Sequence, residues 1–185
     1  MYYSCNKQKK YILAFFAIAM TTGLFTLYFM HGVQGPIYDY DEGKDKAGIV
    51  ALFEKDRYWL TSSSTTSIEH MLKYRSVGNS LTSRSQLVFK VLREDGKFAG
   101  FTAYFMKNKH VGQILFLAVD YEFRGKGYGM MLTKYAIKEL KWMGAQEIIL
   151  VTRTTNFPAQ KVYETVGFRE TSRDSNGYLY YAYTV

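Results

Sequence analysis

Apolar residues are patterned most clearly in the middle of the chain, where they predict a strand followed by a long helix. Residues 111–119 form an almost continuous apolar run, which is typical of a strand buried within a sheet. Over residues 128–143 the apolar side chains recur at spacings of three and four, which predicts an amphipathic helix. Its apolar face holds Tyr128, Met131, Leu132, Tyr135, Ala136, Leu140 and Met143. Gly144 is expected to end this helix as its C-cap.

The flanking segments predict a mixed α/β domain. Short apolar runs predict strands over residues 87–93, 98–107, 147–152 and 178–184, and helices are predicted over residues 68–75 and 157–166. The first two strands are expected to form a hairpin about the turn signal Glu94-Asp95-Gly96-Lys97. A hairpin followed by alternating strands and helices is the order of a mixed sheet covered by helices. Residues 48–60 give no clear pattern, and residues 31–46 are interpreted as a linker.

The N-terminal residues predict a membrane anchor. Residues 11–30 carry no charge and follow three lysines within residues 7–10. An apolar helix of about 20 residues spans the hydrocarbon core of a bilayer, so we expect a single-pass transmembrane helix here. The alternatives are a signal peptide cleaved near Gly32 or Gly35 and a buried helix of a soluble protein. The predicted division is a basic tail (1–10), a transmembrane helix (11–30), a linker (31–46) and a folded domain (47–185).

Composition and charge narrow the class of protein and its partners. Hydrophobic residues make up 48% of the chain, which excludes a disordered protein. The net charge of +8 arises within residues 44–185, so this domain is expected to attract an anionic partner. No RNA-binding motif of aromatic and basic residues and no zinc-ligand spacing occurs in the sequence, so we expect neither nucleic acid nor metal. The single cysteine, Cys5, excludes an intramolecular disulfide.

A glycine-rich turn separates the apolar run at residues 111–119 from the long predicted helix. It reads R-G-K-G-Y-G from Arg124 to Gly129. Glycines permit unusual backbone angles and a close approach of a ligand, and the first N–H groups of a helix have no helical acceptor. With the helix dipole, these features favour a phosphate or pyrophosphate. The glycine spacing differs from a Rossmann fingerprint, and a P-loop would need Ser or Thr where this chain has Gly127.

Two motifs follow one another in this half of the chain. The first is R-x-x-G-x-G, filled by Arg124, Gly127 and Gly129. The second, N-x-x-A-x-x-x-Y-x-x-x-G-F, begins at Asn156 and contains Tyr163. Together they resemble the pyrophosphate loop and the later cofactor-contacting helix of the GNAT family, the GCN5-related N-acetyltransferases. The chain departs from the common family form at Tyr121, where that form has proline.

This resemblance implies an enzyme that uses acetyl-CoA as co-substrate and acetylates a primary amine of a small molecule or a protein. It also implies a GNAT-like fold, with a mixed central sheet flanked by helices. The residues it implies in cofactor binding are Leu117, Ala118, Val119, Arg124, Gly125, Lys126, Gly127, Tyr128, Gly129 and Asn156. Tyr163 stands where the family often places the tyrosine that protonates the leaving thiolate. Its alternative role is that of a core aromatic residue.

The general base is not evident from the sequence. Many relatives in the family carry a glutamate near the position of Leu115, but the run from Gln113 to Val119 has no carboxylate. Glu122, beside the turn, is interpreted as a solvated acid. A base is therefore expected from another segment, or the amine loses its proton to water. Two other functions stay open: binding of CoA without catalysis, and a membrane-tethered interaction domain that binds no nucleotide.

The predicted anchor and the implied cofactor give opposite topologies. The lysines precede the apolar segment and no basic residue follows it until Lys44, which predicts that the domain lies across the membrane from the cytoplasm. The acetyl-CoA implied by the resemblance is expected in the cytosol. We favour a cytosolic domain, because the enzyme needs a supply of acetyl-CoA, whereas three lysines before the segment bias its orientation only statistically.

Overall fold

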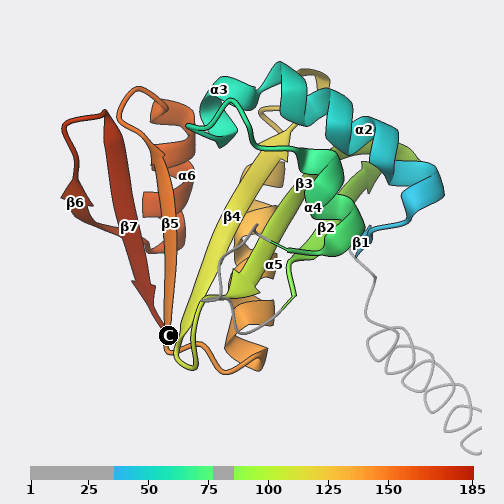
Figure 1. Cartoon of the computed structure of the whole chain (residues 1–185). Helices are drawn as coiled ribbons and strands as arrows, with labels where there is room; N and C mark the ends of the chain where they lie inside the picture. Colours follow the sequence, from blue (N-terminus) through green and yellow to red (C-terminus); the bar gives the residue numbers. More distant parts are fainter. Residues whose placement is uncertain (1–35, 77–85) are drawn as a thin grey trace, which may run out of the picture. The chain divides into compact units, whose positions relative to one another are not determined.

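A seven-stranded sheet organises the residues that the computed structural model describes, 36–76 and 86–185 (Figure 1). The strands are β1 (Ile37–Asp39), β2 (Val88–Glu94), β3 (Lys97–Met106), β4 (Val111–Val119), β5 (Glu147–Arg153), β6 (Arg169–Arg173) and β7 (Tyr178–Thr184). They lie in the order β1-β2-β3-β4-β5-β7-β6. Neighbouring strands are antiparallel except β4 and β5, which are parallel. The single parallel pair therefore lies in the middle of the sheet.

Helices cover both faces of this sheet (Figure 1). They are α2 (Glu42–Lys55), α3 (Arg57–Leu60), α4 (Ile68–Tyr74), α5 (Tyr128–Trp142) and α6 (Phe157–Val166), with a 3-10 turn at Tyr121–Phe123. Residues of α2 and α4 share one buried cluster with β2, β3 and β4, whereas residues of α5 and α6 share another with β5 and β7. The predicted mixed α/β sheet flanked by helices is confirmed.

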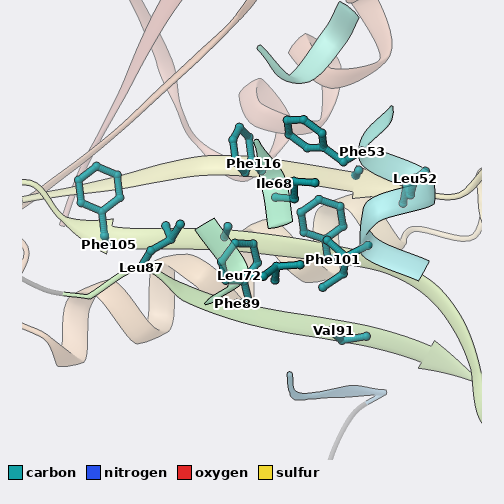
Figure 2. Packing of buried hydrophobic residues seen from close by; sticks show 13 residues of the cluster. Leu52, Phe53, Ile68, Leu72, Leu87, Phe89, Val91, Phe101, Phe105 and Phe116 are labelled. Atoms are coloured by element: carbon teal, nitrogen blue, oxygen red, sulfur yellow. The ribbon is translucent and has the colours of Figure 1, made fainter. Parts of the chain in front are cut away.

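Aromatic side chains fill the core under α2 and α4. Phe53 of α2 packs edge-on against Phe116 of β4, with 5.1 Å between the ring centroids, and Phe89 and Phe101 lie beside Leu72 of α4 (Figure 2). Burial of each such side chain contributes about 1.5–3 kcal/mol. This packing holds the first helices against the sheet although their sequence pattern is weak.

The elements with regular apolar faces form as predicted. The hairpin of β2 and β3 turns at Asp95 and Gly96, whose φ angles of 49° and 75° place both in the left-handed region that such a turn requires. The predicted helix over 128–143 is α5, which ends at Trp142, and Gly144 follows its C-cap with φ of 96°. The predictions of β4, β5, α6 and β7 are also confirmed.

The predictions for the first part of the domain are partly wrong. The described part of the predicted linker, residues 36–46, contains β1 and the start of α2, so the folded unit begins at Pro36 rather than at residue 47. Asp41 accepts the N–H of Lys44 and caps α2, and Asp45 is buried in an ion pair with Arg93. Both acids fall in the predicted linker, because a polar helix cap and a polar loop look alike in sequence. The unpatterned residues 48–60 belong to α2 and α3.

The remaining differences concern β6 and the N-terminus. Strand β6 has no counterpart among the predicted strands, because each of its side chains is exposed and its sequence is polar. The predicted basic tail (1–10) and transmembrane helix (11–30) lie outside the described residues. Within residues 36–76 and 86–185, no helix combines the length and apolar character needed to cross a bilayer.

Candidate functional site

The parallel strands β4 and β5 separate part-way along their length. They pair from Val111 opposite Glu147 to Gln113 opposite Ile149, and among the described strands the rest of β4 pairs only with β3. The separation coincides with a bulge: Ile114 faces Tyr104 and Phe116 faces Ala103, which leaves Leu115 as an extra residue. Beyond the bulge, the edge of β4 that faces β5 has backbone groups that no described strand pairs with. Such groups can pair with an extended ligand.

A cavity of about 730 Å3 lies where β4 and β5 separate. Its walls come from β4 (Leu115, Leu117, Val119), the glycine-rich turn, β5 (Val151, Thr152), α6 (Asn156, Ala159, Tyr163) and α3 (Trp59, Leu60). Pockets for cofactors and other small molecules usually enclose about 300–1,000 Å3. The cavity therefore has room for a nucleotide-sized ligand with an extended arm.

The glycine-rich turn gives one end of the cavity the character of an anion site. Gly125 and Gly127 have φ angles of 81° and 82°, and Gly127 is the N-cap of α5 without any side-chain cap. Among the described residues, the N–H groups from Gly125 to Met130 donate to no acceptor within the protein. Consecutive free N–H groups at the start of a long helix bind phosphate groups. The turn thus has the geometry that the sequence suggested.

The charged side chains of the turn are bound to other elements. The Arg124 guanidinium donates to the Val119 carbonyl at 2.8 Å and to Asp56 at 2.5 Å. Lys126 pairs with Glu94 at 2.7 Å, and it does not line the cavity. Hydrogen bonds from Lys126 and then from Tyr128 lower the pKa of the Glu94 carboxyl. The backbone N–H groups of the turn are therefore the groups that are available to bind an anion.

Tyr163 lies on the wall of the cavity formed by α6. Its ring packs against Phe168 and Tyr181, with centroids 6.0 and 6.2 Å away, and only 7% of the residue is exposed. Burial raises the pKa of Tyr163 to about 12. Its hydroxyl has no hydrogen-bond partner among the described residues. At neutral pH this group is a protonated donor beside the cavity.

Asn156 begins the helix that carries Tyr163. Its side chain accepts the N–H of Ala159 at 3.4 Å and caps α6. Asn156 also lines the cavity. The cap therefore fixes both the start of α6 and one wall of the site.

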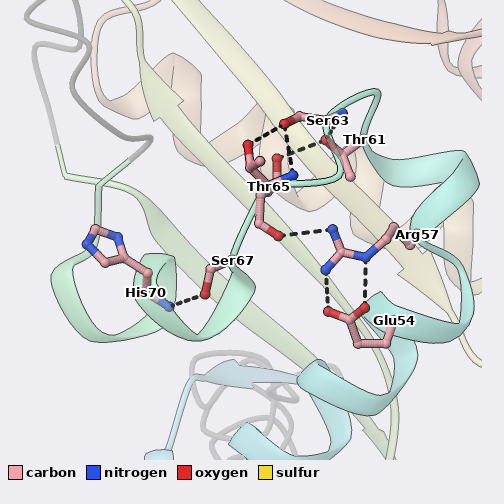
Figure 3. A network of polar contacts seen from close by, with 8 residues as sticks. Glu54, Arg57, Thr61, Ser63, Thr65, Ser67 and His70 are labelled. Atoms are coloured by element: carbon pink, nitrogen blue, oxygen red, sulfur yellow. Dashed lines mark hydrogen bonds and ion pairs between the residues drawn. The ribbon is translucent and has the colours of Figure 1, made fainter.

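The wall formed by α3 is held by a network of polar contacts (Figure 3). Arg57 binds the Glu54 carboxylate and donates to the Thr66 carbonyl at 3.0 Å. The hydroxyls of Thr61 and Thr66 are hydrogen-bonded to each other at 3.1 Å. The Ser67 hydroxyl caps α4 by accepting the N–H of His70. This network ties both sides of the connection between α3 and α4, and so supports Trp59 and Leu60 in the wall.

The structure brings together most of the predicted site residues. Those that line the cavity are Leu117, Val119, Arg124, Gly125, Gly127, Tyr128, Gly129, Asn156 and Tyr163. Ala118 does not, because its side chain points to the core under α2. Sequence reasoning missed Asp56, Trp59, Leu60, Val151 and Thr152, which come from segments without a motif. Asp56 is the one carboxylate of the described cavity wall, and Arg124 already binds it.

Sequence comparisons relate the chain to known acetyltransferases. A family model described as the acetyltransferase (GNAT) family matches residues 40–168. N-alpha-acetyltransferase 30 of Schizosaccharomyces pombe is 40% identical over 68 residues, which are 37% of this chain and 45% of that protein. [Ribosomal protein bS18]-alanine N-acetyltransferase of Salmonella typhimurium is 37% identical over 62 residues, 34% of this chain and 42% of that protein. The chain thus matches less than half the length of these two relatives.

A structural comparison covers more of the chain than the sequence matches do. A GNAT family acetyltransferase from Elizabethkingia anophelis, solved with acetyl-CoA bound, matches with a TM-score of 0.59 at 16% identity. The match covers 80% of this chain and 97% of the other. At this identity the likeness concerns the fold alone.

Proposed function

Because the chain belongs to the acetyltransferase (GNAT) family, we propose that it is an acetyl-CoA-dependent N-acetyltransferase that acts on a primary amine. The observation that carries the proposal is one continuous cavity. It is lined by the glycine-rich turn with its free N–H groups, by the part of β4 that β5 does not pair with, and by Tyr163. The free N–H groups suit a phosphate group, and the unpaired edge of β4 suits an extended arm that contains amides. The tyrosine suits a leaving thiolate, which needs a proton.

The chain's own groups can be assigned roles in this reaction. Acetyl-CoA, when bound, supplies the acetyl group as a thioester. The N–H groups from Gly125 to Met130 bind the pyrophosphate, and the backbone of Leu117–Val119 pairs with the pantetheine arm. Tyr163 holds a proton at its hydroxyl oxygen. As the amine nitrogen bonds to the carbonyl carbon and the carbon–sulfur bond breaks, Tyr163 donates that proton to the sulfur.

The acceptor amine must lose a proton, and the described cavity offers no free carboxylate for this. Asp56 is engaged by Arg124, and β4 carries no acid. We propose that the amine reaches the site neutral or first loses a proton to water. Once bonded to the carbonyl carbon, its nitrogen releases a further proton to water, and the Tyr163 oxygen regains from water the proton that it gives to the sulfur. The same observation favours the second candidate function, a domain that binds CoA without catalysis.

An acceptor panel tests these functions. The chain is incubated with acetyl-CoA and with peptides bearing free α-amino groups, lysine side chains or small amines, and release of the CoA thiol is measured. Peptides with α-amino groups come first, because the two relatives compared above are named for acetylating such groups. Thiol release with any acceptor supports the enzyme. CoA binding without turnover over the whole panel supports the second candidate, and absence of CoA binding rejects both.

We also propose that residues 11–30 anchor the chain in a membrane, with the domain in the cytosol. The proposal rests on the uncharged apolar sequence and on the need for acetyl-CoA. A transmembrane helix resists high-salt and carbonate washing, unlike a basic surface patch. The full-length chain in the wash supernatant would contradict the anchor, and a shortened chain beginning near residues 32–36 would indicate a cleaved signal peptide. Protease access from each side decides the topology.

A further inference from the structure

The Glu94 carboxylate, at the end of β2, binds two side chains of the glycine-rich turn. One oxygen accepts from the Lys126 ammonium at 2.7 Å, and the other accepts from the Tyr128 hydroxyl at 2.5 Å. Lys126 and Tyr128 stand on either side of Gly127 in the sequence. One carboxylate therefore holds both neighbours of the residue that caps α5.

Gly127 is the position of the turn where such restraint matters. Its φ of 82° lies in the left-handed region, and no side chain caps the helix that it begins. A glycine is free to leave this conformation, because it populates positive and negative φ about equally. Fixing the side chains before and after it limits the rotation of both peptide groups that Gly127 shares. The N–H groups of these peptides are among those without a protein acceptor.

The other end of the turn is held in the same way. Arg124 donates to the carbonyl of Val119 and to Asp56, which stands 68 residues earlier in the chain. Contacts to β4, to the α2–α3 corner and to β2 thus fix both ends of the turn. The free donors, from Gly125 to Met130, begin next to Arg124 and include the N–H groups of Lys126 and Tyr128.

We propose that Glu94 is a positioning residue of the cofactor site, which holds the turn in the conformation that binds phosphate. The inference rests on the proposed function and adds a residue outside both sequence motifs. Glu94 acts through Lys126 and Tyr128 and does not itself touch the ligand. Preorganisation of this kind strengthens binding, because less conformational freedom is lost when the ligand arrives.

The direction of a mutational effect distinguishes this role from simple electrostatics. A carboxylate near an anion site repels phosphate, so removal of its charge alone would tighten CoA binding. Loss of a positioning contact would weaken it. Asp95 offers a matched control, because it is the next residue, carries the same charge and makes no ion pair among the described residues. Its φ of 49° is one that asparagine tolerates.

The experiment measures CoA affinity by calorimetry on the full chain in detergent. Glu94→Ala removes both contacts and is expected to weaken CoA binding about tenfold, the scale of a lost charge-assisted hydrogen bond. Glu94→Gln keeps one acceptor oxygen and is expected to weaken it less. Asp95→Asn is expected to leave affinity unchanged or slightly higher. In a chain that already carries Lys126→Met and Tyr128→Phe, adding Glu94→Ala should change affinity less than twofold.

Each outcome bears on the inference. If the parent chain binds CoA and the Glu94 variants bind as tightly or more tightly, the positioning role is wrong while the proposed function stands. A full tenfold effect of Glu94→Ala in the Lys126→Met, Tyr128→Phe background would show that Glu94 does not act through the turn. If the parent chain binds no CoA, the proposed function fails and the inference fails with it.

Discussion

Among single residues, Tyr163 combines a packed ring with a hydroxyl that no described residue engages. Tyr163→Phe keeps the ring and removes the proton donor. General acid catalysis typically contributes about 100- to 10,000-fold, so turnover should fall within this range while CoA affinity stays nearly constant. Steady-state kinetics and calorimetry provide the two measurements. An unchanged rate would leave Tyr163 as a core aromatic residue and the thiolate protonated by water.

The raised pKa of Tyr163 also predicts a pH dependence of stability. The folded protein holds this proton up to about pH 12, whereas an unfolded tyrosine loses it near pH 10. The stabilising contribution is therefore present below pH 10 and is lost as the pH rises toward 12. Denaturant unfolding of Tyr163→Phe should show a weaker decline over this interval than the parent chain. Parallel declines in the two proteins would mean that other groups cause the effect.

Asp45 is the buried charge on which the α2–β2 contact depends. It is 1% exposed, and its carboxylate accepts hydrogen bonds from Nε and Nη2 of Arg93, at 3.0 and 2.6 Å. Breaking a fully buried pair costs about 3–5 kcal/mol. Because 16% of the Arg93 side chain is exposed, Asp45→Asn should cost less, about 2–3 kcal/mol. Asp39→Asn, which removes the exposed partner of Lys90, is the control and should barely change the unfolding free energy.

At the scale of elements, α5 can be tested at its two ends with matched glycines. Gly127 and Gly144 have φ angles of 82° and 96°, and a Cβ on either would meet no atom within 4 Å. Valine at either position is therefore strained to a similar degree. Only Gly127→Val also places a side chain among the free N–H groups. We expect it to abolish CoA binding, whereas Gly144→Val should destabilise the fold to a similar extent and still bind. Equal affinities would contradict the phosphate role of the turn.

Elements could be predicted from the sequence wherever one face is regularly apolar. Helix α5 and strand β4 meet this condition, because each has buried residues at its characteristic spacing. Helix α2 does not, since its first turn is polar and its buried apolar residues begin only at Ile49. Strand β6 has β7 as its one partner in the described part of the sheet and is exposed on both faces, so its sequence shows no alternation of apolar and polar residues. The local sequence pattern therefore does not predict an element that is held in place by residues distant in the sequence.

The same limit applies to the site in the whole molecule. The turn and Tyr163 lie within motifs, so the sequence could place them in one site. Asp56 and Glu94 reach the turn across 68 and 34 residues, and nothing in their local sequence signals the contact. The wall residues Trp59 and Val151 come from α3 and β5, and neither lies within a motif. Motifs identify the groups that meet a ligand, and the fold supplies those that hold them.

The start of the folded unit gives a prediction for the molecule as a whole. A fragment from Pro36 keeps β1, the Asp41 cap and the Asp45–Arg93 pair. A fragment from residue 47, the boundary expected from the sequence, lacks all three. It also leaves Arg93 without its partner and the β1 edge of β2 unpaired. We expect the longer fragment to unfold cooperatively and bind CoA, and the shorter one to aggregate or unfold at a clearly lower temperature. Equal thermal stability of the two would mean that β1 and the first turn of α2 contribute little to the domain.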